Sequence, residues 1–236
     1  MDKNKIIVTG GTGRFGTVLK KSNFNYNMIF PKKKELDITN FNSIKKYLKK
    51  TKPFCLIHLA GLSRPMKIHE KEILKSIQLN IIGTSNIVRV CKIFGIKLIY
   101  FSTSYVYPGK RGNYKETDPL LPSNNYAWSK LGGEAAVHMY KNSLIIRASM
   151  TEKPFVHKQA YANVITNFIY HEDFIKIFKK LIHKKGVFNV GGPTNSVYNF
   201  AKSNNPKIKK IFLKNKKRSL MPINSSMNFS KLKKFI

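Results

Sequence analysis

Three glycines stand at a fixed spacing just after the first apolar run of the chain. The β-branched run over residues 5–9 predicts a buried strand, and residues 15–23 predict a helix. Gly10 permits a tight turn, Gly13 lets the backbone approach a phosphate, and Gly16 lets the helix pack closely on the strand. Because the start of a helix offers free N–H groups and a positive dipole end, this strand–turn–helix predicts a site for the pyrophosphate of a nicotinamide dinucleotide. The cofactor-binding residues predicted in this turn are Gly10, Gly13, Arg14, Phe15 and Gly16.

Apolar runs alternate with helical stretches along most of the chain. We expect strands over residues 5–9, 27–30, 54–59, 96–101, 143–147 and 187–190, and helices over residues 15–23, 41–50, 70–94, 126–140 and 173–184. Such alternation predicts an α/β fold with a doubly wound parallel sheet, the Rossmann fold. Residues 1–150 would form the NAD(P)-binding domain. Residues 151–236 are less regular and carry four prolines, so we expect a short C-terminal substrate-binding lobe, interleaved with the last elements of the sheet.

The chain of 236 residues carries 44 Lys and Arg against 11 Asp and Glu, a formal net charge of +33. The cations run from Lys3 to Lys234, so we interpret them as solvated lysines that attract nucleic acid only nonspecifically. No apolar run approaches the about 20 residues that cross a bilayer, and the first residues lack a signal-peptide core. We therefore expect a cytoplasmic protein with no membrane partner. Cys55 and Cys91 lie among apolar neighbours and no Cys/His cluster has metal-ligand spacing, so we expect free thiols and no metal.

The loop after the second predicted strand bears on the choice between NAD and NADP. In dinucleotide-binding folds this strand normally ends in an acid that accepts from the adenosine ribose 2′-hydroxyl. Here a proline and three lysines follow, among them Lys32 and Lys33, with no acid at that place. An ammonium group there suits a 2′-phosphate, so we favour NADP, with NAD as the alternative. Asp37, followed by Ile38, is placed either to accept from the adenine amino group or to cap the next helix, whose other candidate caps are Thr39 and Asn40.

Tyr126 and Lys130 are four residues apart in a predicted helix and therefore share one face. A phenol with an ordinary pKa of about 10 is a poor acid–base catalyst at neutral pH unless a nearby cation stabilises its phenolate, and Lys130 supplies that cation. Thr103 and Ser104 follow the fourth predicted strand. Ligands of open parallel sheets collect at the carboxyl ends of the strands, so a hydroxyl group there and the phenol are placed to reach one carbonyl oxygen.

Four motifs occur in order along the chain. They are the Thr-Gly-x-x-Gly-x-x-Gly of residues 9–16, the His-Leu-Ala-Gly of residues 58–61, the Ser-Thr-Ser-Tyr-Val-Tyr of residues 102–107 and the Tyr-x-x-x-Lys of residues 126–130. Together they resemble the extended short-chain dehydrogenase/reductase family, which contains nucleotide-sugar epimerases, dehydratases and reductases. The match covers about residues 3–192. It implies that four further residues line the cofactor, namely Leu59, Ala60, Gly61 and Asn80.

The form Ser-Thr-x-Tyr-Val-Tyr, the loop at residues 116–119 and the Pro-x-Asn-Ser of residues 222–225 are most similar to the dTDP-4-dehydrorhamnose reductases and related nucleotide-sugar reductases. This resemblance implies NAD(P)H-dependent reduction of a 4-keto nucleotide sugar, in deoxysugar or polysaccharide biosynthesis such as that of dTDP-rhamnose. Tyr126 would protonate the C4 oxygen as hydride arrives, Thr103 would hold that oxygen, and Lys130 would also bind the nicotinamide ribose. The substrate-binding residues we expect are Ser104, Arg64 and Arg147.

Departures from the family pattern leave the substrate open. The chain is shorter than typical members, residues 150–154 replace an aromatic loop, and Arg218 stands at an unusual distance from the proline that follows it. The alternatives are a nucleotide-sugar epimerase or dehydratase, although Ser104 stands where a dehydratase uses an acid, and a noncatalytic dinucleotide-binding regulatory subunit. The expected partners are a nucleotide-sugar substrate and, left open, a second copy in a homodimer. We expect His58 and Trp128 to be packing residues.

Overall fold

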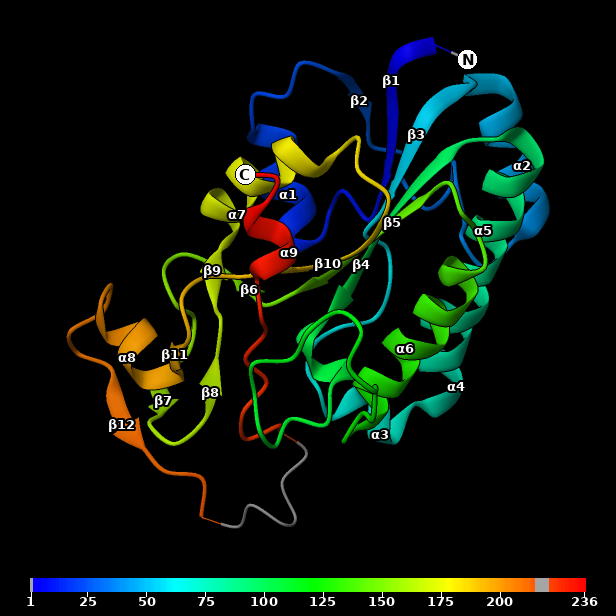
Figure 1. Ribbon diagram of the computed structural model, residues 1–236. Coiled ribbons are helices and arrows are strands. Elements are labelled where there is room, and N and C mark those ends of the chain that lie inside the picture. Colours follow the sequence, from blue (N-terminus) through cyan, green and yellow to red (C-terminus); the bar gives the residue numbers. More distant parts are fainter. Residues whose placement is uncertain (1, 215–220) are drawn as a thin grey trace.

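The computed structural model describes residues 2–214 and 221–236, and Arg218 lies outside the described residues. Six strands form a central sheet in the order β10-β5-β4-β3-β1-β2, with helices on both faces (Figure 1). Every neighbouring pair of strands in this sheet is parallel. The predicted α/β fold with a doubly wound parallel sheet is therefore confirmed.

The strands of the central sheet form where the apolar runs predict them. Their bounds are β1 (Asp2–Thr9), β2 (Asn27–Ile29), β3 (Pro53–His58), β4 (Lys97–Thr103), β5 (Ser143–Ala148) and β10 (Gly186–Val190). Every residue of β4 and β5 is buried, because helices cover both faces of the sheet. The chain runs outward from β1 to β2 on one side and from β3 to β10 on the other, so the strand order reverses between β1 and β3. Ligands of such sheets bind at this reversal, outside the carboxyl ends of the strands.

The two faces of the sheet are covered by different helices. α1 (Arg14–Lys21) and α7 (His171–Leu181) pack their apolar side chains with Ile6 and Val8 of β1. α2 (Phe41–Thr51), α5 (Gly83–Phe94) and α6 (Asn125–His138) pack on the opposite face, with Ile7. Successive side chains of a strand point to opposite faces, so β1 contributes to both halves of the core.

The helical stretch predicted over residues 70–94 is present, with a break and an irregular turn that were not predicted. The segment forms α3 (Ile68–Lys71), α4 (Ile73–Ser76), a π-helical turn η1 (Ile77–Ile82) and then α5. Glu72, with φ −117° and ψ 62°, leaves the helical region and separates α3 from α4. The start of α2 resolves the choice of cap, because Asn40 Oδ1 accepts from the Ser43 amide at 3.0 Å.

The chain beyond β5 forms a second, smaller packing unit beside the sheet. Three two-stranded pairs occur there: β6 (Met150–Thr151) with β9 (Ile169–Tyr170), β7 (Gln159–Tyr161) with β12 (Lys209–Ile211), and β8 (Ile165–Thr166) with β11 (Asn195–Ser196). With α8 (Val197–Lys202) these segments bury their own apolar cluster, built from Phe155, Ala160, Val164, Val197, Ala201 and Ile208. The same half of the chain also contributes to the central sheet. β10 is one of its strands, and α7 and α9 (Ser230–Lys233) pack on one of its faces. The domain boundary at residue 150 stays a prediction.

The end of the chain also packs beneath the loop that follows β4. A short 3₁₀ helix, η2 (Ser104–Val106), continues from β4. Tyr107 and Tyr114 of the next loop share a small apolar cluster with Met227. The Tyr114 amide donates to the Ser226 carbonyl at 3.0 Å. The C-terminal segment therefore supports the loop that leaves the carboxyl end of β4.

In the part of the chain that the structure describes, no helix is both long enough and apolar enough to cross a membrane. Among the same residues, no group of His, Cys, Asp and Glu side chains gathers in a way that could hold a metal ion. Cys55 and Cys91 are free thiols, and both are buried.

Candidate active site

The glycine turn joins β1 to α1 at the point where the strand order of the sheet reverses (Figure 1). Gly10 has a φ of 74°, in the left-handed region, and a Cβ there would lie 2.6 Å from the Ala60 nitrogen. The Gly13 amide donates to the Gly10 carbonyl at 3.0 Å and closes the turn. A Cβ on Gly16 would overlap the same carbonyl oxygen. The turn therefore lies directly against the segment that follows β3, and only glycine fits at Gly10 and Gly16.

The first turn of α1 is open to an anion. Its N-cap residue, Gly13, has no side chain to cap the helix, and no acid stands in the first turn. Phe15 anchors this end of the helix, with its ring centroid 5.2 Å from that of Phe101 and 5.3 Å from that of Phe174. Uncapped N–H groups and the helix dipole favour a phosphate at this position.

The loop after β2 carries the lysines predicted to contact a 2′-phosphate. Lys32 and Lys33 are both exposed. The Lys32 amide donates to Glu35 Oε2 at 2.7 Å, so the loop also holds an acid that sequence reasoning did not include. Asp37 Oδ1 accepts from the amide and the hydroxyl of Thr39, at 2.9 and 2.8 Å. Desolvation raises the pKa of Asp37, but the bonds from Thr39 and the charge of Lys33 outweigh it and lower the pKa overall.

The segment after β3 is held against β1 and α5. The Leu59 amide donates to the Thr9 carbonyl at 3.2 Å, and the Ala60 amide to the Thr9 hydroxyl at 3.3 Å. A Cβ on Gly61 would lie 2.7 Å from Asn80 Oδ1, so the chain passes very close to the π-helical turn. Ile38 is buried and packs against Gly83, the first residue of α5, so closely that a Cβ on this glycine would touch its side chain.

Asn80 lies in the π-helical turn η1 and is buried. Its Oδ1 accepts from the Leu62 amide at 2.7 Å, and its Nδ2 donates to the Leu62 carbonyl at 2.9 Å and to the Ser129 hydroxyl at 2.8 Å. The Ser129 hydroxyl donates in turn to the Tyr126 carbonyl at 2.7 Å. Asn80 therefore ties the loop after β3 to the helix that carries Tyr126. Single π-helical turns of this kind are frequent at functional sites. Its contact with the cofactor stays a prediction.

The structure brings Thr103 and Tyr126 together. Thr103 ends β4, and α6 starts at an Asn124 cap, whose Oδ1 accepts from the Ala127 amide at 2.8 Å. Tyr126 therefore lies in the first turn of α6, where its phenol comes near the Thr103 hydroxyl. Desolvation raises the pKa of Tyr126, whereas the neighbouring Thr103 hydroxyl and the charges of Arg64 and Arg14 oppose the rise. Ser104, the next residue along from Thr103, is buried.

Lys130 lies one turn along α6 from Tyr126. Its Nζ sits 4.2 Å from the centroid of the Tyr100 ring, and the Tyr100 hydroxyl donates to the Lys130 carbonyl at 3.0 Å. Desolvation lowers the pKa of Lys130 to about 7, and the Glu134 carboxylate opposes that fall. The lysine is therefore close to its own midpoint at neutral pH, and its charge depends on its neighbours.

Glu152, which sequence reasoning missed, joins two of the predicted arginines. Its carboxylate lies 3.3 Å from Arg14 Nη1 and 3.1 Å from Arg64 Nη1. Arg14 also donates to the Ser63 hydroxyl at 2.8 Å. Desolvation raises the pKa of Glu152, but its own backbone amide and the two arginines outweigh it and lower the pKa overall. One signal in the sequence pointed to this segment: residues 150–154 stand where the family pattern has an aromatic loop.

His69 is a second residue that the sequence did not single out. Its ring packs edge-on against Tyr126, with the centroids 5.1 Å apart. One ring nitrogen hydrogen-bonds with the Ser76 hydroxyl and the other lies 3.3 Å from the Ser63 carbonyl. His69 thus supports both the phenol and the loop that carries Arg64. Nothing in its sequence spacing indicated this position.

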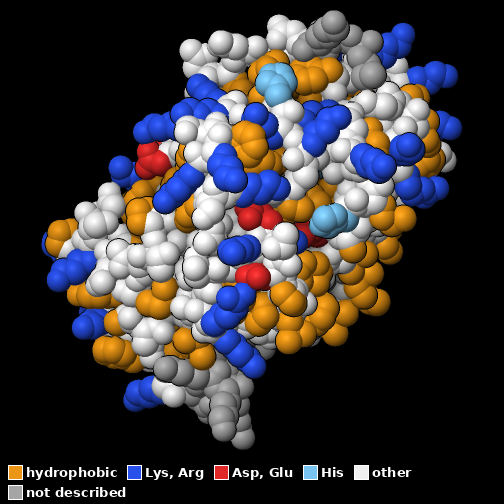
Figure 2. Space-filling view, viewed as in Figure 1, with side chains coloured by type: hydrophobic (Ala, Val, Ile, Leu, Met, Phe, Trp, Pro, Cys, Tyr) orange, Lys and Arg blue, Asp and Glu red, His pale blue; other side chains and the backbone are white. Residues whose placement is uncertain are grey.

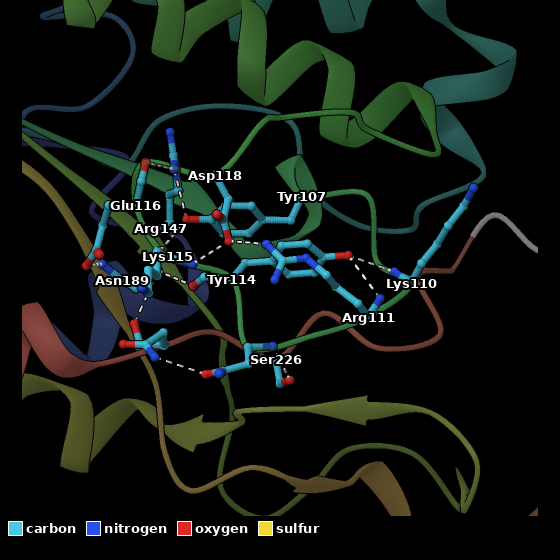
Figure 3. Close-up of polar contacts among 12 residues, drawn as sticks. Tyr107, Lys110, Arg111, Tyr114, Lys115, Glu116, Asp118, Arg147, Asn189 and Ser226 are labelled. Carbon is cyan, nitrogen blue, oxygen red and sulfur yellow. Dashed lines mark hydrogen bonds and ion pairs between the residues drawn. The ribbon is translucent and has the colours of Figure 1, made fainter.

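The expectation that Arg147 contacts the substrate is corrected by the structure. Arg147 is only 2% exposed, and its Nε and Nη2 donate to Glu134 Oε1 at 3.0 and 2.6 Å. Its Nη1 donates to the Tyr107 hydroxyl at 2.8 Å and to the Glu116 carbonyl at 3.0 Å. Figure 3 shows Arg147 beside Tyr107 and Glu116, and Asn189 extends this network by accepting from the Tyr107 hydroxyl. Because it is buried and four of its five N–H groups donate inside the protein, Arg147 is not placed to contact a substrate.

His58 and Trp128, which were both expected to be packing residues, differ in how far they are buried. His58 is buried, hydrogen-bonded to the hydroxyls of Thr9 at 2.8 Å and Thr84 at 3.1 Å, and burial lowers its pKa to about 3. It is a neutral structural residue. Trp128 is 48% exposed on α6 and lines a hollow with Ile73 and Ile77, so it packs only in part. Helical spacing alone did not show which face of α6 it occupies.

Three known proteins illustrate what the chain resembles. Methionine adenosyltransferase 2 subunit beta of Pongo abelii is 29% identical over 142 residues, which cover 56% of this chain and 42% of that protein. The dTDP-4-dehydrorhamnose reductase of Aggregatibacter actinomycetemcomitans is 27% identical over 202 residues, covering 81% and 63%. The crystal structure of dTDP-4-dehydrorhamnose reductase from Bacillus anthracis in complex with NADP superposes with a TM-score of 0.86 and 25% identity, covering 98% of this chain and 92% of that one.

The chain spans less than two thirds of the length of these two curated relatives. The family model described as the RmlD substrate binding domain matches residues 4–184, which include the glycine turn, the carboxyl end of β4 and the first turns of α6. The expected resemblance to the extended short-chain dehydrogenase/reductases is confirmed. The chain belongs to the RmlD substrate-binding domain family.

Proposed function

We propose that this protein is an NAD(P)-dependent oxidoreductase that reduces the 4-keto group of a nucleotide sugar, as a dTDP-4-dehydrorhamnose reductase does. The observation that carries this proposal is the approach of the Tyr126 phenol to the Thr103 hydroxyl, with Lys130 one turn further along α6. A hydroxyl, a phenol and an ammonium group are thus placed at the carboxyl ends of the strands, on the same edge of the sheet as the glycine turn.

The residues present fit a dinucleotide. Gly10 brings the turn against the end of β3, and the uncapped first turn of α1 offers N–H groups to a pyrophosphate. When bound, the reduced nicotinamide supplies the hydride. We propose that NADPH is favoured over NADH, because Lys32 and Lys33 are exposed beside the end of β2. The complex of the Bacillus anthracis reductase with NADP supports that preference.

Three side chains perform the proton chemistry in this proposal. Tyr126 donates its proton to the C4 oxygen of the substrate. Thr103, whose hydroxyl lies near the phenol in the free protein, hydrogen-bonds the same oxygen. Lys130 binds the nicotinamide ribose and stabilises the phenolate that forms on Tyr126. Ser104 and Arg64 are the proposed substrate contacts, and Arg64 is placed by its ion pair with Glu152.

The reaction is tested by adding a dTDP-4-keto-6-deoxysugar and NADPH to the purified protein and following oxidation of the dinucleotide. Substrate-dependent oxidation, with a 4-hydroxy sugar identified by mass spectrometry, is the expected result. Tight NADPH binding without turnover of any dTDP- or UDP-linked 4-keto sugar would contradict the proposal.

A noncatalytic dinucleotide-binding subunit is a second candidate. The similarity to a protein named as a beta subunit of methionine adenosyltransferase favours it. The presence of Tyr126 near Thr103, with Lys130 one turn along the same helix, favours the reductase, since a binding subunit needs no proton donor. Binding of a dinucleotide with no turnover, unchanged in Tyr126→Phe, is the result that would select the subunit.

The proposed partner besides the substrate is a second copy of this chain. Ile73, Ile77 and Trp128 line one hollow between α4, η1 and α6 and are 51%, 37% and 48% exposed, and Leu74, next to Ile73, is 82% exposed. Figure 2 shows apolar side chains gathered at its lower right, where Figure 1 draws α4 and α6. The charges beside Leu74 are Lys75 and Glu72, which pair with each other. Residues 76–88 contain no Lys or Arg and residues 116–140 contain one, Lys130. Because two copies with a net charge of +33 repel elsewhere, this weakly charged surface is where they can approach.

The homodimer is tested by sedimentation of the wild type and of Leu74→Glu. We expect a dimer that the substitution converts to a monomer without loss of fold. A monomeric wild type at micromolar concentration would contradict a stable homodimer. The buried free thiols Cys55 and Cys91 support our proposal that the protein works in the reducing cytoplasm.

A further inference from the structure

A buried carboxylate lies one helical turn beyond the proposed catalytic lysine. Tyr126, Lys130 and Glu134 are spaced four apart along α6 and share one face of it. Glu134 is 0% exposed. Its Oε1 accepts both bonds from Arg147, while its Oε2 has no hydrogen-bond partner among the described residues. The negative charge of Glu134 is therefore only partly compensated by Arg147.

The titratable groups that interact with Lys130 come from four elements. Besides Glu134 they are Tyr100 on β4, His58 on β3 and His69 on α3, and Tyr126 lies one turn before Lys130 on α6. Burial lowers the pKa of both histidines and raises the pKa of both tyrosines, so all four are neutral at neutral pH. Among these described groups, Glu134 is the one that carries a negative charge.

Arg147 explains why Glu134 remains ionised in the interior. Its guanidinium is 2% exposed and donates twice to one oxygen of the carboxylate. Tyr107 and the Glu116 carbonyl hold the other end of the guanidinium, so its position is fixed (Figure 3). A buried carboxylate held in this way stays charged, whereas an isolated one would take up a proton.

We propose that Arg147 and Glu134 are positioning residues that keep Lys130 charged: Arg147 holds Glu134 as a carboxylate, and the carboxylate stabilises the ammonium group one turn away. The inference rests on the proposed function only for the role of the charged lysine in the reaction. Desolvation already brings the pKa of Lys130 down to about 7, with Glu134 as the opposing group. Loss of the carboxylate would leave the lysine largely neutral at neutral pH.

The charge on Lys130 is measurable without substrate or dinucleotide. The full-length protein is labelled with acetic anhydride over a series of pH values, and acetylation of Lys130 is followed by mass spectrometry of its peptides. The reagent reacts with the neutral amine, so the labelling midpoint reports the pKa of Lys130. We expect a midpoint near pH 7 in the wild type and a midpoint lower by about one pH unit or more in Glu134→Gln. Glu134→Gln keeps an oxygen that accepts from Arg147.

The matched control is Glu72→Gln, which removes an exposed carboxylate paired with Lys75 and leaves the midpoint at its wild-type value. If circular dichroism shows that Glu134→Gln does not fold, the double variant Glu134→Leu with Arg147→Met replaces the buried pair by apolar side chains, which such pairs often tolerate. The same fall is expected there. A midpoint equal to that of the wild type in the folded variant overturns the inference. Absence of turnover by the wild type would contradict the proposed reaction alone and would leave these midpoints as predicted.

Discussion

The hydroxyl of Thr103, at the end of β4, lies near the phenol of Tyr126, in the first turn of α6, and opposes the rise in the pKa of that phenol. The two residues are brought together by the parallel sheet, because β4 ends at the edge where α6 begins its return across the sheet. This contact preorganises the pair that we propose to bind the C4 oxygen of the substrate.

Thr103→Val should reduce kcat by about 100-fold, since it removes a hydrogen bond to the C4 oxygen in the transition state. Thr103→Ser keeps the hydroxyl and should stay within about tenfold of the wild type. Steady-state kinetics with NADPH and a dTDP-4-keto sugar compare the two variants. Equal rates for both would show that the hydroxyl takes no part in the reaction.

Gly10→Ala should abolish dinucleotide binding and destabilise the fold, because the new methyl group would lie 2.6 Å from the Ala60 nitrogen at a φ of 74°. Gly186→Ala is the matched control, with a φ of 87° but no atom nearer to the new Cβ than Lys231 Nζ at 3.9 Å. The control should cost only about 1 kcal/mol, from backbone strain. Thermal unfolding and fluorescence titration with NADPH measure both effects, and retained binding in Gly10→Ala would contradict the proposed cradle.

The double variant Lys32→Ala with Lys33→Ala should weaken NADPH binding by about tenfold, the usual contribution of about 1 kcal/mol from exposed charges, and leave NADH binding unchanged. Lys45→Ala with Lys46→Ala removes the same charge from exposed positions of α2 and serves as the control. Parallel titrations with the two dinucleotides check the prediction. An equal loss of affinity for both would assign the effect to net charge rather than to the 2′-phosphate.

His58 should make the protein sensitive to mild acid. Burial lowers the pKa of His58 from its ordinary 6.5 to about 3, so below pH 6.5 the unfolded chain takes up a proton that the folded chain excludes. Its stabilising effect is complete above pH 6.5 and is lost progressively as the pH falls towards 3. Between pH 7 and pH 5 the loss should be about 2 kcal/mol. The buried His69 and His171, whose pKa values are also lowered, add to this loss. Urea unfolding should therefore show at least that difference in the wild type and in the exposed control His157→Asn, whereas His58→Asn should reduce it by about 2 kcal/mol.

The fold followed from the sequence because the information for it is local. Each apolar run of the central sheet is flanked by a helix with its own periodicity, and glycine spacing marks the turn after β1. The break at Glu72 and the π-helical turn around Asn80 were missed, because the apolar spacing of residues 70–94 suits one continuous helix. Bonds to Leu62 and Ser129, distant in the sequence, accompany the irregular backbone there.

The site residues that lie within sequence motifs were predicted. Those that reach the site only through contacts between distant segments of the chain were missed. Thr103, Tyr126 and Lys130 stand in recognisable spacings. Glu152 acquires its position only when the chain after β5 meets the glycine turn, which no local pattern encodes. Arg147 was misassigned because an arginine at a strand end suits a substrate contact equally well, and only the buried Glu134 on the neighbouring helix reveals its partner.

Comparison of Tyr126→Phe with the wild type tests the central claim most directly. The substitution removes one hydroxyl and should lower kcat for NADPH-dependent reduction of a dTDP-4-keto sugar by about 100- to 10,000-fold, with NADPH affinity unchanged. Tyr47→Phe, on α2, is the matched control and should keep full activity. A Tyr126→Phe protein that reduces the sugar as fast as the wild type would contradict the account.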